Sequence, residues 1–117
     1  MHKHLQALGR LPVGVMNKTE KAYELHLKKL LNDGLILWYK FEPIKFRLAD
    51  KTYYTPDFLV LNDKNELEVH EVKGSPAIFY DDAKVKVKVC ADIYPMKFFV
   101  AFPKKGSRLS QWDVNEV

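Results

Sequence analysis

Apolar residues recur at helical spacing in the first third of the chain, between residues 18 and 32. At 100° per residue, one face of this segment collects Tyr23, Leu27, Leu30 and Leu31. Asn17 precedes it as a capping residue, Glu20 stands at the third helical position, and Gly34 follows as a stop. The pattern predicts a helix from Lys18 to Asn32, with Glu20 almost directly above the centre of the apolar stripe. Taken alone, Glu20 is typical of a capping box that binds backbone at the helix start.

After Gly34 the pattern changes to short apolar or alternating runs bounded by turn residues, which is typical of strands. We expect strands over residues 35–41, 44–48, 57–61, 66–73 and 96–102, and an edge strand over residues 109–114. The polar residues 62–65 between the third and fourth runs predict a β-hairpin. The strand over residues 96–102 is strongly apolar and should be central.

Within the hairpin, the period of two separates the side chains into two faces. Glu71 and Lys73 continue the face of Leu67 and Val69, where solvation explains a charged pair poorly. The opposite face carries Glu66, Glu68 and His70. We expect this second face, including His70, to be exposed to solvent.

Residues 80–93 fit two structures. Lysine and valine alternate strictly over residues 84–89, which favours a strand. As a helix, the segment places Val87 and Cys90 on one side and a second apolar stripe on the other, formed by Val85, Val89 and Ile93. Two apolar faces on one helix would imply packing against a sheet and against a second subunit, and the local pattern leaves both structures open.

Composition adds modest constraints. Nineteen Lys and Arg against fifteen Asp and Glu give a formal charge of +4 and a pI near 9.1, which favours polyanionic partners. Cys90 is the only cysteine, so an intrachain disulfide and cysteine-rich zinc sites are excluded. The longest apolar runs are far shorter than the roughly 20 residues of a membrane span. We expect one domain over residues 17–117, an irregular arm over residues 1–16, and a cytoplasmic location.

The hairpin also carries the candidate chemistry. Asp57 begins its first strand and Glu71 ends its second, so antiparallel pairing should bring the two carboxylates side by side. Two acids held close together repel, which raises a pKa or recruits a hard cation such as Mg²⁺. Lys73, on the face of Glu71, could polarise a water or bind a phosphate. The combination suits metal-assisted hydrolysis of phosphodiesters.

Pro56-Asp57 followed fourteen positions later by Glu71-Val72-Lys73 resembles the signature of the PD-(D/E)XK nuclease superfamily. Glu20 fits the helical acid of that family. The resemblance covers roughly residues 18–102 and implies a mixed α/β fold, a restriction-endonuclease-like α-β-β-β-α-β core with a mixed central sheet flanked by helices. It also favours a helix over residues 80–93. The small size of the chain resembles phage-type endonucleases, a group that includes Holliday-junction resolvases.

The resemblance implies roles for individual residues. Asp57 and Glu71 would bind Mg²⁺, or Mn²⁺ in its place, together with the carbonyl of Val72. Lys73 would assist the attacking water, and Glu20 would bind a second ion or orient water. Candidate contacts to the DNA backbone are Lys84, Lys88, Arg47, Lys104, Lys105 and Arg108.

These expectations combine into a Mg²⁺-dependent endodeoxyribonuclease that acts on branched DNA, in the manner of a Holliday-junction resolvase, as a homodimer. A twofold pair of sites suits symmetric cutting of a junction, and the stripe of Val85, Val89 and Ile93 offers a contact surface. The alternatives are a DNA-binding or assembly module that keeps the nuclease fold without activity, and a nicking or restriction-type endonuclease.

Overall fold

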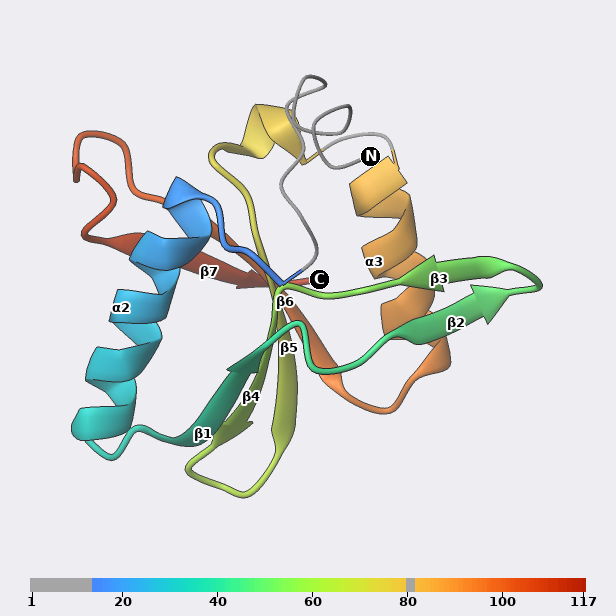
Figure 1. The fold of residues 1–117 in the computed structure, drawn as a ribbon, viewed down its shortest axis with the longest axis horizontal. Helices are drawn as coiled ribbons and strands as arrows, with labels where there is room; N and C mark the ends of the chain where they lie inside the picture. The colour runs from blue at the N-terminus through green and yellow to red at the C-terminus, as the bar shows by residue number, and fades with distance from the viewer. Residues whose placement is uncertain (1–13, 80–81) are drawn as a thin grey trace.

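The chain folds as a mixed sheet covered by helices, as a computed structural model shows for residues 14–79 and 82–117. A five-stranded sheet has the order β1-β4-β5-β6-β7, and β2 and β3 form a separate two-stranded sheet. Within the described part of the chain there are two α-helices, α2 and α3, on opposite sides of the large sheet (Figure 1). The expected mixed α/β class is therefore confirmed.

Helix α2 spans Lys18–Asn32, as predicted. The Asn17 side chain accepts a hydrogen bond from the Glu20 N–H, and the Glu20 carboxylate accepts one from the Asn17 N–H, each 2.8 Å long. This capping box satisfies two of the free amides at the helix start. At the other end, Gly34 adopts φ +77°, a conformation that glycine enters without steric cost.

Three antiparallel strands follow the helix in the large sheet: β1 (Ile36–Phe41), β4 (Phe58–Asn62) and β5 (Leu67–Val72). The β4–β5 pair is the predicted hairpin, with Phe58 opposite His70 and Leu61 opposite Leu67. Its turn is closed by the Asn62 side chain, whose oxygen accepts hydrogen bonds from the backbone N–H groups of Lys64 and Glu66. The predicted strand boundaries are correct here to within two residues.

After a short 3₁₀ turn at Pro76–Ile78, helix α3 spans Asp82–Ile93 and leads into β6 (Lys97–Pro103). Strand β6 pairs in parallel with β5, and β7 (Trp112–Glu116) pairs antiparallel with β6 at the edge. The helix confirms the structure that the family resemblance favours over the strand-like alternation of residues 84–89. Burial of Val87 and Cys90 against the sheet decides the conformation, because the tertiary contacts outweigh local propensity.

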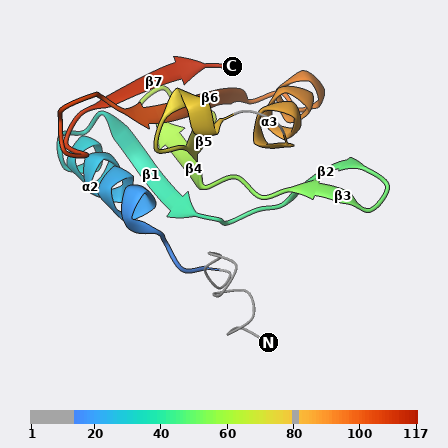
Figure 2. The same ribbon diagram turned by 90° about the horizontal axis from the view of Figure 1, so that it is seen from above.

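Strands β2 (Phe46–Ala49) and β3 (Thr52–Tyr54) form a hairpin that projects beyond the end of the large sheet (Figure 2). The sequence analysis predicts β2, with a start two residues early, and misses β3. A strand of three residues is too short to show an alternating pattern. The hairpin is held by Tyr94, the residue directly after α3, whose hydroxyl donates a 2.6 Å hydrogen bond to the Arg47 carbonyl.

The large sheet is buried on both faces. Between α2 and the sheet lies a core that includes Tyr23, Leu27, Ile36, Phe58, Val60, Val72, Ala101 and Trp112. Between the sheet and α3 with its hairpin lies a second core that includes Phe46, Tyr54, Leu59, Val69, Val87, Cys90, Phe98 and Val100. Leu31, expected on the buried stripe of α2, is 37% exposed because it lies at the edge of that stripe in the last turn.

The prediction that His70 lies on a solvent face is wrong. His70 is only 5% exposed because α2 covers that face of β5. The Tyr23 hydroxyl lies 2.7 Å from His70 Nδ1, and Glu68 Oε1 lies 2.9 Å from Nε2. An ionised Glu68 can only accept, so in the neutral imidazole Nε2 donates to Glu68 and Nδ1 accepts from the Tyr23 hydroxyl. A polar chain therefore links the helix to the sheet within the core.

Residues 1–13 of the predicted arm lie outside the described residues. From residue 14 onward, the chain contacts the rest of the domain. The Gly14 N–H donates a 3.1 Å hydrogen bond to Glu42, and Met16 packs against the core beneath α2. No helix in the described part of the chain is long and apolar enough to cross a membrane.

Replacing Tyr23 with Phe should lower the free energy of unfolding by about 1–3 kcal/mol, because the buried Nδ1 of His70 loses its donor. Urea denaturation followed by circular dichroism measures the change. Tyr39→Phe is the matched control, since the Tyr39 hydroxyl makes only a 3.4 Å contact with Glu24 at a half-buried position. Equal stability of the Tyr23 and Tyr39 variants would contradict a structural role for the Tyr23–His70 bond.

Candidate active site

The two carboxylates that the sequence analysis singles out lie side by side. Asp57 immediately precedes β4 and Glu71 is the fifth residue of β5. Because Phe58 pairs with His70, the antiparallel register continues directly to Asp57 opposite Glu71. Both acids are buried, with 8% and 6% of their surface exposed. The hairpin thus holds two acidic groups together in a poorly solvated place.

Backbone geometry fixes the Asp57 side chain. Its Oδ2 accepts a 2.7 Å hydrogen bond from the Val72 N–H, the amide next to Glu71. The Asp57 carbonyl also accepts from the Glu42 N–H, at 2.8 Å, at the end of β1. These bonds anchor the start of β4 to both neighbouring strands, so the Asp57 carboxylate is positioned by the sheet itself.

The Glu71 carboxylate is held through both of its oxygens. Lys73 Nζ lies 3.3 Å from Oε2, and the Tyr54 hydroxyl donates a 2.7 Å hydrogen bond to Oε1. The Lys73 side chain is about one quarter exposed, so it can reach both Glu71 and a molecule arriving from solvent. Tyr54 comes from β3, which makes the β2–β3 hairpin part of the site.

Glu20 approaches the pair from the start of α2. Its carboxylate completes the capping box with Asn17 and also lies close enough to hydrogen-bond the side chain of Asp57. The capping role and the position beside the site are therefore not alternatives, because one carboxylate serves both. The structure brings together four of the residues predicted for the site, Glu20, Asp57, Glu71 and Lys73, and the Val72 backbone joins them.

The electrostatics of the cluster favour a bound proton or cation. Burial raises the pKa of Asp57 well above its ordinary range, and the neighbouring charges of Glu71 and Glu20 raise it further. Burial also raises the pKa of Glu71, against the opposing effects of Lys73 and Tyr54. Two like charges with this little solvent are costly unless a positive charge lies between them.

The donor set suits a hard divalent cation with open coordination positions. In the described part of the chain no three His, Cys, Asp or Glu side chains are arranged to hold a metal ion among themselves. Mg²⁺ is ordinarily bound by one or two carboxylates and keeps several waters. The carboxylates of Asp57 and Glu71 could meet that smaller requirement.

The residues predicted to contact DNA are spread over the molecule. Arg47 is exposed on the β2–β3 hairpin, whereas Lys104, Lys105 and Arg108 are exposed on the β6–β7 loop at the opposite end (Figure 1). Lys104 Nζ also lies 3.7 Å from Asp113, a weak exposed ion pair. The two regions do not form one continuous basic surface.

Lys84 and Lys88 are placed differently, one turn apart on α3. Together with Phe79, Val100 and Phe102 they line a hollow of about 360 Å³ that reaches the end of β7. Val100 is the partner of Glu71 in the parallel β5–β6 pair, so this hollow adjoins the strand next to the acids. Of the residues predicted to contact DNA, Lys84 and Lys88 are therefore the two that line a hollow beside the strand next to the acids.

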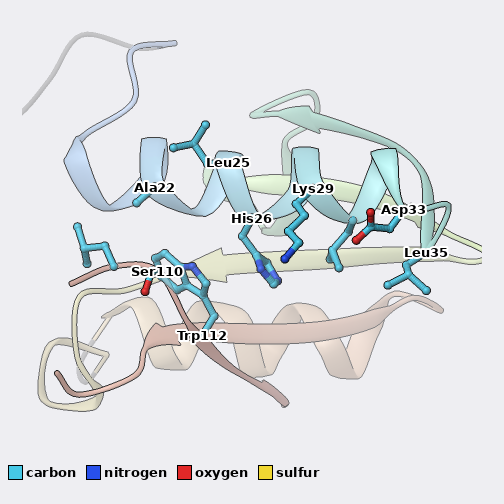
Figure 3. A pocket seen from close by; sticks show the side chains of 10 residues that line it. Ala22, Leu25, His26, Lys29, Asp33, Leu35, Ser110 and Trp112 are labelled. Atoms are coloured by element: carbon cyan, nitrogen blue, oxygen red, sulfur yellow. The ribbon is translucent and has the colours of Figure 1, made fainter. Parts of the chain in front are cut away.

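A separate cleft of about 510 Å³ lies between α2 and the residues that lead into β7 (Figure 3). It is lined by His26, Lys29, Ser110 and Trp112 and by several leucines. The buried Trp112 Nε1 lacks a hydrogen-bond acceptor, and its ring meets the Tyr23 ring edge to face at 4.9 Å. None of the four predicted site residues lines this cleft, so it is distinct from the acid cluster.

Tyr54 is the contributor that sequence reasoning misses. It directly precedes the Thr55-Pro56-Asp57 run, and the sequence analysis assigns it no part in the site. The only available signal is its position two residues before a proline that begins a motif, and such a position does not show that the hydroxyl meets Glu71. That contact depends on how the hairpin docks on α3.

Comparisons of the chain with protein-family models, with curated proteins and with solved structures gave no match.

Asp57→Asn should raise the melting temperature by a few degrees at pH 8 in the presence of chelator. The pKa of Asp57 is higher in the folded protein than in the unfolded chain, so folded Asp57 binds a proton more tightly. The stability of the wild type therefore falls as the pH rises from the ordinary pKa of an aspartate to the raised pKa of Asp57. Asparagine removes this charge and still accepts from Val72. The gain should shrink towards pH 4, where Asp57 is protonated.

Thermal unfolding across this pH range, with Asp63→Asn from the exposed turn as control, measures the effect. A wild-type protein more stable than Asp57→Asn at pH 8 would show that other groups of the protein already offset the negative charge of the two acids.

Proposed function

We propose that the chain is a Mg²⁺-dependent endodeoxyribonuclease with a restriction-endonuclease-like core. The observation that carries the proposal is the pair of buried carboxylates, Asp57 and Glu71, with Lys73 Nζ 3.3 Å from Glu71. Glu20 beside Asp57 and the order of elements, a helix, three sheet strands, a helix and a further strand, support it. The resemblance to PD-(D/E)XK nucleases supplies the reaction, the hydrolysis of phosphodiesters.

Each residue of the cluster has a task in this chemistry. Asp57 and Glu71 would hold Mg²⁺ with the Val72 carbonyl; the bound ion would neutralise charge on the scissile phosphate and lower the pKa of a water. Lys73, partly exposed and paired with Glu71, would orient the attacking water or contact the phosphate. Glu20, fixed by its capping box, would orient a water on the Asp57 side or bind a second ion.

DNA would approach along α3. Lys84 and Lys88 line the hollow beside β6, and phosphate contacts from lysines supply affinity without sequence preference. Arg47 and the loop residues Lys104, Lys105 and Arg108 lie at opposite ends of the molecule, so they would contact a substrate only where it extends past the site. A branched substrate, which presents several arms, suits this separation better than a short linear duplex.

A homodimer is part of the proposal. Val85, Val89 and Ile93 form an exposed stripe on α3, with Val85 60% and Ile93 51% exposed. Beside the stripe, Leu48 and Ala49 of the hairpin line an apolar hollow of about 320 Å³ together with Val85 and Val89. Contact between two copies here would bury apolar surface and provide two related sites for symmetric cutting.

Cleavage assays on defined DNA test the activity. Purified protein should cut a four-way junction in Mg²⁺, more efficiently than nicked, flap or linear DNA, and chelator should abolish cutting. Asp57→Ala and Lys73→Ala should each lower the rate at least about a hundredfold, because each removes a group that acts on the reacting atoms.

Lys64→Ala, in the exposed hairpin turn, controls for the loss of a lysine and should cut normally. DNA affinity, measured by fluorescence anisotropy, should stay nearly unchanged in all three variants. Failure of the wild type to cut any of these substrates in Mg²⁺ or Mn²⁺ would leave a DNA-binding module without activity, and normal cutting by Asp57→Ala would place the site elsewhere.

Val89→Lys should convert the dimer to a monomer, since it places a charge in the centre of the proposed contact. Sedimentation velocity across a range of protein concentrations measures the change. Leu25→Lys, on the exposed side of α2, is the control and should remain dimeric. A wild type that stays monomeric at high concentration, with and without junction DNA, would remove the dimer from the proposal.

A further inference from the structure

Tyr54 is the only described side chain outside the predicted set that donates a hydrogen bond to one of the two buried acids. Its hydroxyl lies 2.7 Å from Glu71 Oε1, and both side chains are buried. Lys73 occupies the other oxygen, Oε2. With a donor on each oxygen, the Glu71 carboxylate has one defined orientation and cannot rotate without breaking a bond.

The Tyr54 donor is neutral, which matters at a cation site. A phenol donates a hydrogen bond without adding positive charge beside a metal ion. A carboxylate that ligates a metal can also accept a hydrogen bond from a neighbouring protein group. Such hydrogen bonds orient the ligand and increase metal affinity. Asp57 has the corresponding support from the Val72 N–H.

The position of Tyr54 depends on an element outside the main sheet. Among the described residues, strand β3 pairs only with β2. The hairpin is fixed through Phe46, whose ring packs at a tilt against Tyr94 with centroids 4.6 Å apart, and through the Tyr94–Arg47 hydrogen bond. The hairpin therefore delivers the Tyr54 hydroxyl to Glu71 from one side, while β5 delivers the carboxylate from the other.

We infer that Tyr54 is a positioning residue that holds the Glu71 carboxylate in the orientation that binds the divalent cation. The inference rests on the proposed function. Tyr54 does not touch the reacting atoms in this account and acts only through Glu71. Its loss should therefore weaken metal binding and leave the chemical step, once metal is bound, largely intact.

Isothermal titration of the full-length protein with Mn²⁺, in the absence of DNA, tests this directly. Tyr54→Phe keeps the ring and removes the hydroxyl, and it should weaken Mn²⁺ binding roughly tenfold to a hundredfold. The Mn²⁺ concentration that gives half-maximal cleavage should rise by the same factor, while the rate at saturating Mn²⁺ should stay within a few-fold of wild type. A purely structural role would lower thermal stability and leave the metal affinity of the folded protein unchanged.

Two matched variants separate the hydroxyl from the hairpin. Tyr53→Phe changes the exposed neighbour on β3, and Tyr94→Phe removes the hydrogen bond that docks the hairpin without touching Glu71. Both should bind Mn²⁺ as the wild type does, because Tyr94→Phe keeps the ring that packs against Phe46 and so keeps the hairpin docked. If Tyr54→Phe does not fold, Tyr54→Met, which also lacks the hydroxyl and fills much of the same space, provides the comparison.

Wild-type affinity for Mn²⁺ in a folded Tyr54→Phe or Tyr54→Met protein would overturn the role of Tyr54 and leave the proposed nuclease intact. A wild-type protein that binds no Mn²⁺ and cuts no DNA would instead remove the proposed function, on which the role of Tyr54 depends.

Discussion

The burial of two opposed carboxylates is the constraint on which the candidate site depends. Asp57 and Glu71 face each other because the β4–β5 hairpin pairs in register, and burial raises the pKa of both. A protein selected only for stability would gain by replacing one of them with a neutral residue. With both acids present and one lysine beside Glu71, a bound divalent cation would compensate the remaining negative charge, as the proposed function requires.

The rest of the fold supports this pair from three directions. The N-terminus of α2 brings Glu20 to Asp57, and the Tyr23–His70–Glu68 chain ties that helix to β5 in the core. The parallel strand β6 lies along β5 and accepts the Lys73 N–H at the Ala101 carbonyl, 3.0 Å away. The β2–β3 hairpin adds Tyr54. Displacement of any of these elements would remove a contact made by one of the site residues.

Local patterns predicted the parts of the structure that local interactions determine. The capping box, Gly34 and the Asn62 turn define α2 and the β4–β5 hairpin, and the pairing of Asp57 with Glu71 follows from the hairpin. The prediction that His70 is exposed was wrong because the period of two assigns side chains to two faces of a strand but does not show whether each face is covered by a helix. The conformation of residues 84–89 and the contact of Tyr54 with Glu71 depend on packing between distant segments, which local patterns do not contain.

The central claim is that Asp57 and Glu71 together bind a divalent cation used for phosphodiester hydrolysis. A crystal structure of the protein soaked in Mn²⁺, with anomalous diffraction recorded at the manganese edge, tests it most directly. The account predicts an anomalous peak between the two side chains, roughly 2.1 Å from an oxygen of each. The absence of a peak there at saturating Mn²⁺, with both carboxylates ordered, would contradict the account.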